Sequence, residues 1–213
     1  MNWQITYALA NFAKPGRSTA VHVEDDLIRV MTPDQPDVLA AIAPGETIDL
    51  ATATYYRQRF PAMDFLCGYR SSCVWEGDAI RYLQDHGVGW GSFGTLSSAA
   101  LDGKAKTASH KTYFFSDRLL RQYGRVAQAV REFDRVYQVT LKNGVVFRLG
   151  MIAEYEPTAD AVRSLWDRFG PMDVAWNINP NGSPSKEAID AGNELGCKVT
   201  KWEELRDYIH QRS

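Results

Sequence analysis

The order of apolar and polar positions in the second half of the chain predicts alternating strands and helices. Strands are expected over 135–141 and 145–153, on either side of Asn143-Gly144, a dipeptide typical of a tight hairpin turn. Beyond this hairpin, apolar residues recur at i, i+3, i+4 and i+7, the spacing of one helix face. The other elements expected are a helix over 117–123, a helix between Thr158 and Gly170, a strand over 173–178, a helix from Ser183-Pro184 to Gly196, a strand over 197–201 and a helix over 203–210.

The first half repeats this order with weaker signals. The expected elements are a helix near 7–12, strands near 21–31 and 38–42, a helix carrying Ala53, Tyr56 and Phe60, a strand over 64–69, a helix over 77–85 and a strand near 88–93.

The chain also matches itself at a shift of 109 residues. The anchor is RFPAMDF (59–65), which falls on RFGPMDV (168–174). We therefore expect an α/β fold of two tandem, pseudo-symmetric repeats, each α-β-β-α-β-α-β with room for a third strand in the meander. The repeats are placed at 1–98 and 113–213, and the small, lysine-bearing segment 99–112 is interpreted as a linker.

Composition narrows the class of protein. The 213 residues are 45% hydrophobic and 23% charged, which excludes a disordered or fibrous chain. The net charge of −2 argues against binding nucleic acid by bulk charge alone, although basic residues are in excess in the second half. Cys67, Cys73 and Cys197 are expected to be buried thiols in a reducing compartment. Without a membrane-length apolar run or a signal peptide, a cytoplasmic location is predicted.

The element order of the second copy, with its ending NPNGSPSKEAIDAGNELGCKVTKWEEL, resembles the PD-(D/E)xK restriction-endonuclease-like superfamily. The resemblance covers about 113–210 and, through the duplication, 5–98. It implies an Asp on one hairpin strand and an (Asp/Glu)-x-Lys on the next, which together hold Mg²⁺ or Mn²⁺ and activate water for phosphodiester cleavage.

The candidate metal ligands only partly fit that pattern. Asp134 matches the first Asp, Asp25 is its counterpart in the first copy, and Glu154 or Glu156 stands on the next strand. No lysine follows either glutamate at the required spacing, and Arg148 is a poor substitute because it is always protonated. We therefore expect degenerate metal sites. The alternative for the shared aspartate is stabilisation of the hairpin.

A basic surface is the candidate for nucleic-acid binding. Arg118, Arg121 and Arg125 fall at i, i+3 and i+7 of the helix that opens the second copy, so one helix face can present guanidinium groups to phosphates. Lys104, Lys106 and Lys111 precede it in the linker. The alternative is a solvated face on which the arginines pair with Asp117, Glu132 and Asp134.

The segment from Gly89 to Gly94 satisfies G-x-G-x-x-G, a pattern typical of dinucleotide sites. The duplication places it on the last strand of the first copy and the exit from that strand. No acidic residue follows at the distance of about 20 residues that a dinucleotide site uses. A role in turning and packing is predicted.

Three functions remain open. The leading hypothesis is a nucleic-acid-associated protein that binds DNA, RNA or a nucleic-acid-processing partner on a nuclease-like scaffold with degenerate metal sites. The second is an active metal-dependent endonuclease using Asp134 and Glu154. The third is a protein-interaction or nucleotide-binding module in a cleft between the repeats, to which the turns at 68–72 and 177–182 would contribute.

Overall fold

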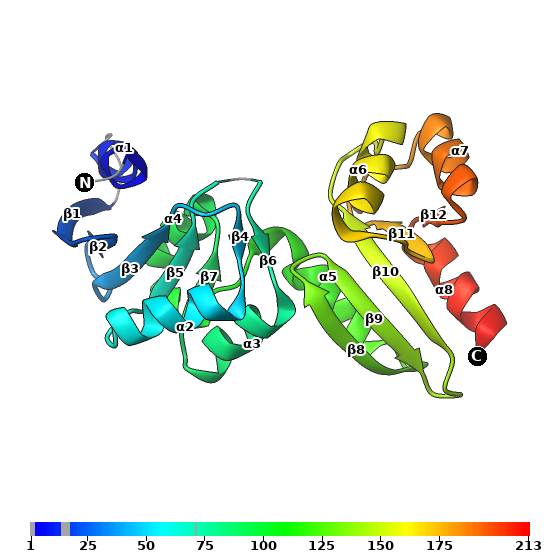
Figure 1. Ribbon diagram of the computed structural model, residues 1–213, viewed down its shortest axis with the longest axis horizontal. Helices are drawn as coiled ribbons and strands as arrows, with labels where there is room; N and C mark the ends of the chain where they lie inside the picture. Colours follow the sequence, from blue (N-terminus) through cyan, green and yellow to red (C-terminus); the bar gives the residue numbers. More distant parts are fainter. Residues whose placement is uncertain (1–2, 14–17, 71) are drawn as a thin grey trace. The chain divides into compact units, whose positions relative to one another are not determined.

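The computed structural model describes residues 3–13, 18–70 and 72–213, and the chain divides into two compact units, Met1–Lys111 and Thr112–Ser213. We call them unit 1 and unit 2. Each is built on a mixed five-stranded sheet flanked by helices (Figure 1), so the predicted α/β class is confirmed.

The sheet of unit 1 has the strand order β1-β2-β3-β5-β7. Its first three strands form an antiparallel meander, and β5 and β7 are added in parallel because helices carry the chain back between them. A second, two-stranded sheet pairs β4 with β6. The elements are α1 (Trp3–Phe12), β1 (Thr19–Glu24), β2 (Leu27–Met31), β3 (Val38–Ala43), β4 (Thr47–Ile48), α2 (Leu50–Arg59), β5 (Phe65–Gly68), β6 (Val74–Trp75), α3 (Gly77–Asp85), β7 (Gly89–Gly91), α4 (Phe93–Leu101) and the 3₁₀ helix η1 (Ala105–Thr107).

The sheet of unit 2 has the same arrangement, in the order β8-β9-β10-β11-β12. The meander β8-β9-β10 is antiparallel, and β11 and β12 continue it in parallel. The elements are α5 (Lys111–Gln122), β8 (Val126–Phe133), β9 (Val136–Leu141), β10 (Val146–Ile152), α6 (Ala159–Phe169), β11 (Val174–Asn177), α7 (Lys186–Leu195), β12 (Lys198–Thr200) and α8 (Trp202–Arg212).

The two units repeat each other at the predicted shift of 109 residues. β5 and β7 fall on β11 and β12 with the same bounds, and α4 falls on α8. Both meanders contain the third strand for which the sequence left room: 21–31 divides into β1 and β2, and β8 precedes the hairpin of unit 2. Residues 99–101 and 105–107, expected in the linker, form the end of α4 and η1.

The aspartate shared by the two anchor segments has the same structural role in both units. A carboxylate oxygen of Asp64 accepts a hydrogen bond from the backbone nitrogen of Leu39 at 2.9 Å, and Asp173 does the same for Arg148 at 2.7 Å. The carboxylate thus ties the residue before β5 to β3 in unit 1, and the residue before β11 to β10 in unit 2. This explains why the anchor contains an aspartate without assigning it any chemistry.

Local sequence signals account for most helix ends. Thr158 caps α6 by accepting a hydrogen bond from the nitrogen of Ala161, as predicted. The prediction that α7 begins at Ser183-Pro184 was wrong, because Ser185 is the cap. Residues 183–185 are held in extended backbone: the nitrogens of Ser183 and Ser185 donate to the carbonyls of 155 and 157.

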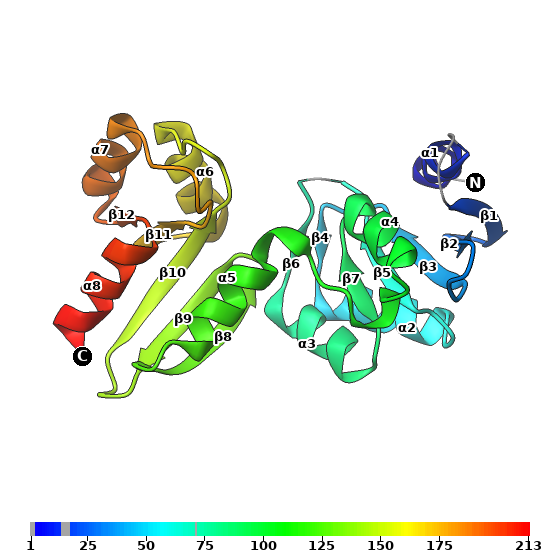
Figure 2. The ribbon, with the colours of Figure 1, turned by 180° about the vertical axis from the view of Figure 1, so that it is seen from behind.

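Helices cover both faces of each sheet. In unit 1, α2 and α3 bury Tyr56, Ile80 and Leu83 on one face, and α1 and α4 cover the other face (Figures 1 and 2). In unit 2, α5 and α8 cover one face with Leu120 and Leu205, while α6 and α7 pack against β10 and β12. None of the helices in the described residues is long and apolar enough to span a membrane.

The three thiols should be unreactive in the folded protein. Cys67, Cys73 and Cys197 are buried, and burial raises the pKa of Cys67 and, to about 11, that of Cys197. At pH 8, a thiol reagent such as DTNB should label fewer than one cysteine in the folded protein and three in urea. Rapid labelling of a thiol in the folded protein would contradict this burial.

Candidate functional site

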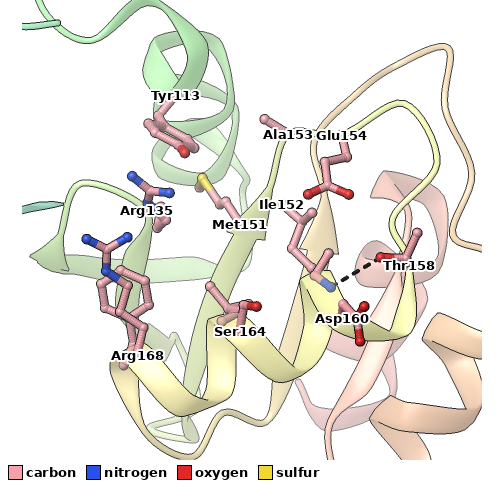
Figure 3. Close-up of a pocket in the computed structure, with 13 residues that line it drawn as sticks. Tyr113, Arg135, Met151, Ile152, Ala153, Glu154, Thr158, Asp160, Ser164 and Arg168 are labelled. Carbon is pink, nitrogen blue, oxygen red and sulfur yellow. Dashed lines mark hydrogen bonds between the residues drawn. The ribbon is translucent and has the colours of Figure 1, made fainter. Parts of the chain in front are cut away.

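A cavity of about 570 Å³ in unit 2 is lined by Glu154, one of the metal ligands predicted from the sequence (Figure 3). Arg135, which follows the predicted ligand Asp134, also lines it. It opens between the start of α5, the β8–β9 turn, the end of β10 and one side of α6. Its lining is Tyr113, Arg135, Met151, Ile152, Ala153, Glu154, Thr158, Asp160, Ala161, Ser164, Leu165, Arg168 and Phe169. We call it the unit 2 pocket.

Arg135 is held in place by a fully buried carboxylate and by two aromatic rings. Its Nε and Nη2 donate to the two oxygens of Asp134 at 3.0 and 2.9 Å. Its guanidinium carbon lies 5.1 Å from the ring centre of Tyr113 and 5.8 Å from that of Phe169. Such a bidentate, stacked arginine is pre-organised and loses little further freedom when it binds an anion.

The two ends of the unit 2 pocket carry opposite charge. Arg168 also lies over the ring of Phe169, at 5.9 Å, so both guanidinium groups are within 6 Å of one ring centre. Figure 3 shows these arginines at one end, Glu154 and Asp160 at the other, and Met151 and Ser164 between them. Burial raises the pKa of Tyr113 to about 12, so its phenol is protonated at neutral pH and can donate a hydrogen bond.

The donor set does not suit a divalent cation. Both oxygens of Asp134 accept hydrogen bonds from Arg135, whose positive charge occupies the place next to the carboxylate that a cation would need. Asp134 lies in the β8–β9 turn and not on a strand, and Glu154 follows the end of β10. Over residues 3–13, 18–70 and 72–213, no group of three His, Cys, Asp or Glu side chains is placed to hold a metal ion. The guanidinium group of Arg135 thus lies where the resemblance implies a metal.

Asp25, the counterpart of Asp134, lies in a different setting in unit 1. It is in the β1–β2 turn with φ of 40°, its side chain is 53% exposed, and it pairs with Arg59 of α2. Hydrogen bonding and the charge of Arg59 lower the pKa of this carboxyl group. Asp26 stands where unit 2 has Arg135, and it accepts a hydrogen bond from the hydroxyl group of Tyr56 at 3.1 Å.

Arg148, the candidate replacement for the missing lysine, is fixed within the fold. Its Nε donates to Glu132 at 2.7 Å, and its Nη1 donates to the carbonyls of Phe169 and Pro171 at 2.7 and 2.8 Å. These contacts tie β8, β10 and the end of α6 together. The structure therefore assigns Arg148 a packing role.

The three arginines of the predicted basic face have different surroundings. Arg121 pairs with Asp117 at 2.9 Å and donates to the carbonyl of Ala129 at 2.7 Å. Asp117 also pairs with Arg131 at 2.9 Å, so this carboxylate binds two arginines. Arg125 lies beyond the end of α5, in the turn before β8, whereas Arg118 is exposed on the helix. Arg121 is exposed on α5 as well, but Asp117 and the carbonyl of Ala129 hold its guanidinium group.

The exposed face of α5 combines basic and aromatic residues. Tyr113, Ser116 and Leu120 are buried against the sheet, so the opposite face meets solvent. On it, Phe114 is 56% and Phe115 70% exposed. We call the exposed residues Lys111, Phe114, Phe115 and Arg118 the α5 outer face; their spacing of three or four residues places them together, without an acidic residue. The spacing of the basic residues was evident in the sequence, whereas the exposed phenylalanines were not predicted.

The remaining lysine candidates lie in unit 1. Lys106 forms an ion pair with Asp64 at 3.3 Å, and Lys104 precedes η1. Both line a second cavity of about 370 Å³ beside Asp37 and Asp64. The turns at 68–72 and 177–182 likewise belong to different units, and residue 71 lies outside the described residues.

No protein family, curated protein or solved structure was found to match this chain. A function for this protein therefore has to be inferred from the site itself.

Proposed function

We propose that the protein binds single-stranded nucleic acid through the α5 outer face, on a duplicated scaffold that resembles the PD-(D/E)xK nucleases and whose metal sites have degenerated. The observation that carries this proposal is the pairing of exposed phenylalanines with basic residues on one helix face. Large exposed aromatic side chains are costly in water and are typical of surfaces on which unpaired bases stack. Lys111 and Arg118 supply the contacts to phosphate.

Single strands suit this face better than duplex does. In a duplex the bases stack on each other, so Phe114 and Phe115 could contact only the backbone or the groove walls. The unit 2 pocket supports the loss of metal chemistry, because Arg135 neutralises Asp134. The second and third functions considered from the sequence are outcomes of the tests below.

Replacing both phenylalanines with alanine should weaken binding to a labelled 20-nucleotide single strand by roughly 10-fold or more, because each stacked base contributes about 1–3 kcal/mol. Lys111→Gln with Arg118→Gln should instead reduce the salt dependence: the slope of log K against log salt should fall by about 1.4, since each phosphate contact on a single strand contributes about 0.7. Fluorescence anisotropy at several KCl concentrations measures both effects, on DNA and on RNA.

Arg206→Gln is the matched control, because Arg206 is exposed on α8 of the same unit. It should leave affinity and slope unchanged. Equal loss in the control and the α5 variants, or no loss in either, would overturn the proposal. Gels run with Mg²⁺, with Mn²⁺ and with chelator test the metal: cleavage that needs the cation and disappears in Asp134→Ala would favour the nuclease alternative.

A further inference from the structure

The unit 2 pocket has the polarity of a site for a molecule with a strongly anionic end and a hydroxyl-bearing end. Arg135 and Arg168 are at one end and the carboxylates of Glu154 and Asp160 at the other (Figure 3). Guanidinium groups bind phosphate through paired hydrogen bonds, and carboxylates accept hydrogen bonds from sugar hydroxyls. The cavity, at about 570 Å³, falls in the size range of small-molecule sites.

Comparison of the two repeats shows what makes the unit 2 pocket distinctive. The second helix of each repeat keeps an arginine, Arg59 or Arg168, and a phenylalanine after it. Around that arginine, unit 2 has Ser164 and Leu165 where unit 1 has Tyr55 and Tyr56. Tyr56 is buried whereas Tyr55 is 59% exposed, so Leu165 in place of Tyr56 is the change that leaves more room in the interior of unit 2.

The charged residues of the unit 2 pocket also differ from those at the equivalent positions of unit 1. Arg135 of unit 2 replaces Asp26, Glu154 replaces Gly45 and Asp160 replaces Ala51. These changes add an arginine at one end of the cavity and two carboxylates at the other. Unit 1 forms a five-stranded sheet of the same strand order without these three side chains.

We propose that the unit 2 pocket binds a phosphate monoester carried on a sugar, with the phosphate at Arg135 and Arg168 and the sugar hydroxyls at Glu154 and Asp160. Three sources share this chemistry: a free sugar phosphate, a free ribonucleotide, and the 5′-phosphorylated end of an RNA strand. The site is separate from the α5 outer face and does not depend on the proposed function. Tyr113 and Ser164 add hydroxyl groups to the lining.

Isothermal titration with ribose 5-phosphate, AMP and ribose tests the proposal on the full chain. Ribose 5-phosphate or AMP should bind, and ribose, which lacks the phosphate, should not. AMP binding without ribose 5-phosphate binding identifies a nucleotide. A 5′-phosphorylated RNA that binds more tightly than the same strand with a 5′-hydroxyl identifies a strand end, and this too supports the site. No binding of any phosphorylated probe would overturn it.

Variants assign the binding to this cavity. Arg168→Gln should weaken it at least 10-fold by removing one phosphate contact, and Ser164→Tyr, which introduces the unit 1 side chain, should weaken it equally by filling the space. Both positions are exposed, so folding should survive, and circular dichroism checks this. Glu154→Gln should weaken binding of ribose 5-phosphate but not of inorganic phosphate.

Arg59→Gln is the matched control in unit 1 and should leave binding unchanged. Equal loss in Arg59→Gln and Arg168→Gln, or full binding in Ser164→Tyr, would overturn the assignment. The two proposals can fail separately. Binding of a single strand with a 5′-hydroxyl depends on the α5 outer face and should survive the pocket variants, whereas AMP binding should survive Phe114→Ala with Phe115→Ala.

Discussion

Asp134→Ala is expected to lower the free energy of unfolding by about 3 kcal/mol, because it leaves a partly buried arginine without its carboxylate. Asp134 is fully buried, and both its oxygens accept hydrogen bonds from Arg135. Arg135 in turn lies over Tyr113 of α5 and Phe169 of α6. When Asp134 no longer holds Arg135 in place, the packing of these two helices should loosen as well. The estimate is at the low end for a buried pair because the side chain of Arg135 is 20% exposed.

The matched control is Asp25→Asn at the equivalent position of unit 1, because asparagine tolerates the positive φ of 40° there. That carboxylate is exposed and pairs with an exposed arginine, so we expect little change in stability. Urea unfolding followed by circular dichroism and tryptophan fluorescence measures both variants without added metal. Carboxylates gathered to bind a cation repel each other when it is absent, so removing a true metal ligand should leave stability unchanged or raise it. A stabilised Asp134→Ala protein would therefore contradict the structural role.

Much of the fold could be predicted because the two repeats give the same order of elements, so the clear signals of one support the weaker signals of the other. The hairpin at Asn143-Gly144 formed as expected, with Gly144 at φ of 90°, and so did the strands joined by it. The third strand of each meander could not be placed. β1 and β8 are edge strands with mostly exposed or half-buried side chains, so they lack the alternation that marks a strand with one buried face.

The candidate site was harder to predict, because spacing gives the face of a helix but not the partners of its side chains. The spacing of Arg118 and Arg121 is compatible with one basic surface. Asp117 pairs with Arg121 one turn away and with Arg131 from the neighbouring strand, and only the fold brings Arg131 to it. Asp134 is bound by its neighbour in sequence, Arg135, but the sequence does not show that this carboxylate is fully buried.

A signal for the unit 2 pocket was nevertheless present in the sequence. Aligning the two copies at a shift of 109 sets Tyr55 against Ser164 and Asp26 against Arg135. Asp64 and Asp173, which agree between the copies, serve the scaffold, whereas two of the positions that line the unit 2 pocket differ.

Gly89→Ala is expected to lower the free energy of unfolding by about 3 kcal/mol, and Gly94→Ala, in the same G-x-G-x-x-G segment, to raise it by about 0.5 kcal/mol. A β-carbon on Gly89 would lie 1.8 Å from the carbonyl oxygen of Ala105 and 2.9 Å from the ring of Phe65. The backbone of η1 would have to move, and η1 contributes Ala105 to the core.

Gly94 has no such neighbour. It lies in the first turn of α4, and the nearest atom to an added β-carbon is Ser92 Oγ at 3.8 Å. Alanine there restricts the unfolded chain and favours the helix. In a dinucleotide fingerprint the third glycine permits close packing of helix and strand, so its replacement should be harmful. Urea unfolding measures both variants. If only Gly89 is needed for packing, the two changes in the free energy of unfolding should have opposite signs. A destabilised Gly94→Ala protein would contradict a purely structural role for this segment.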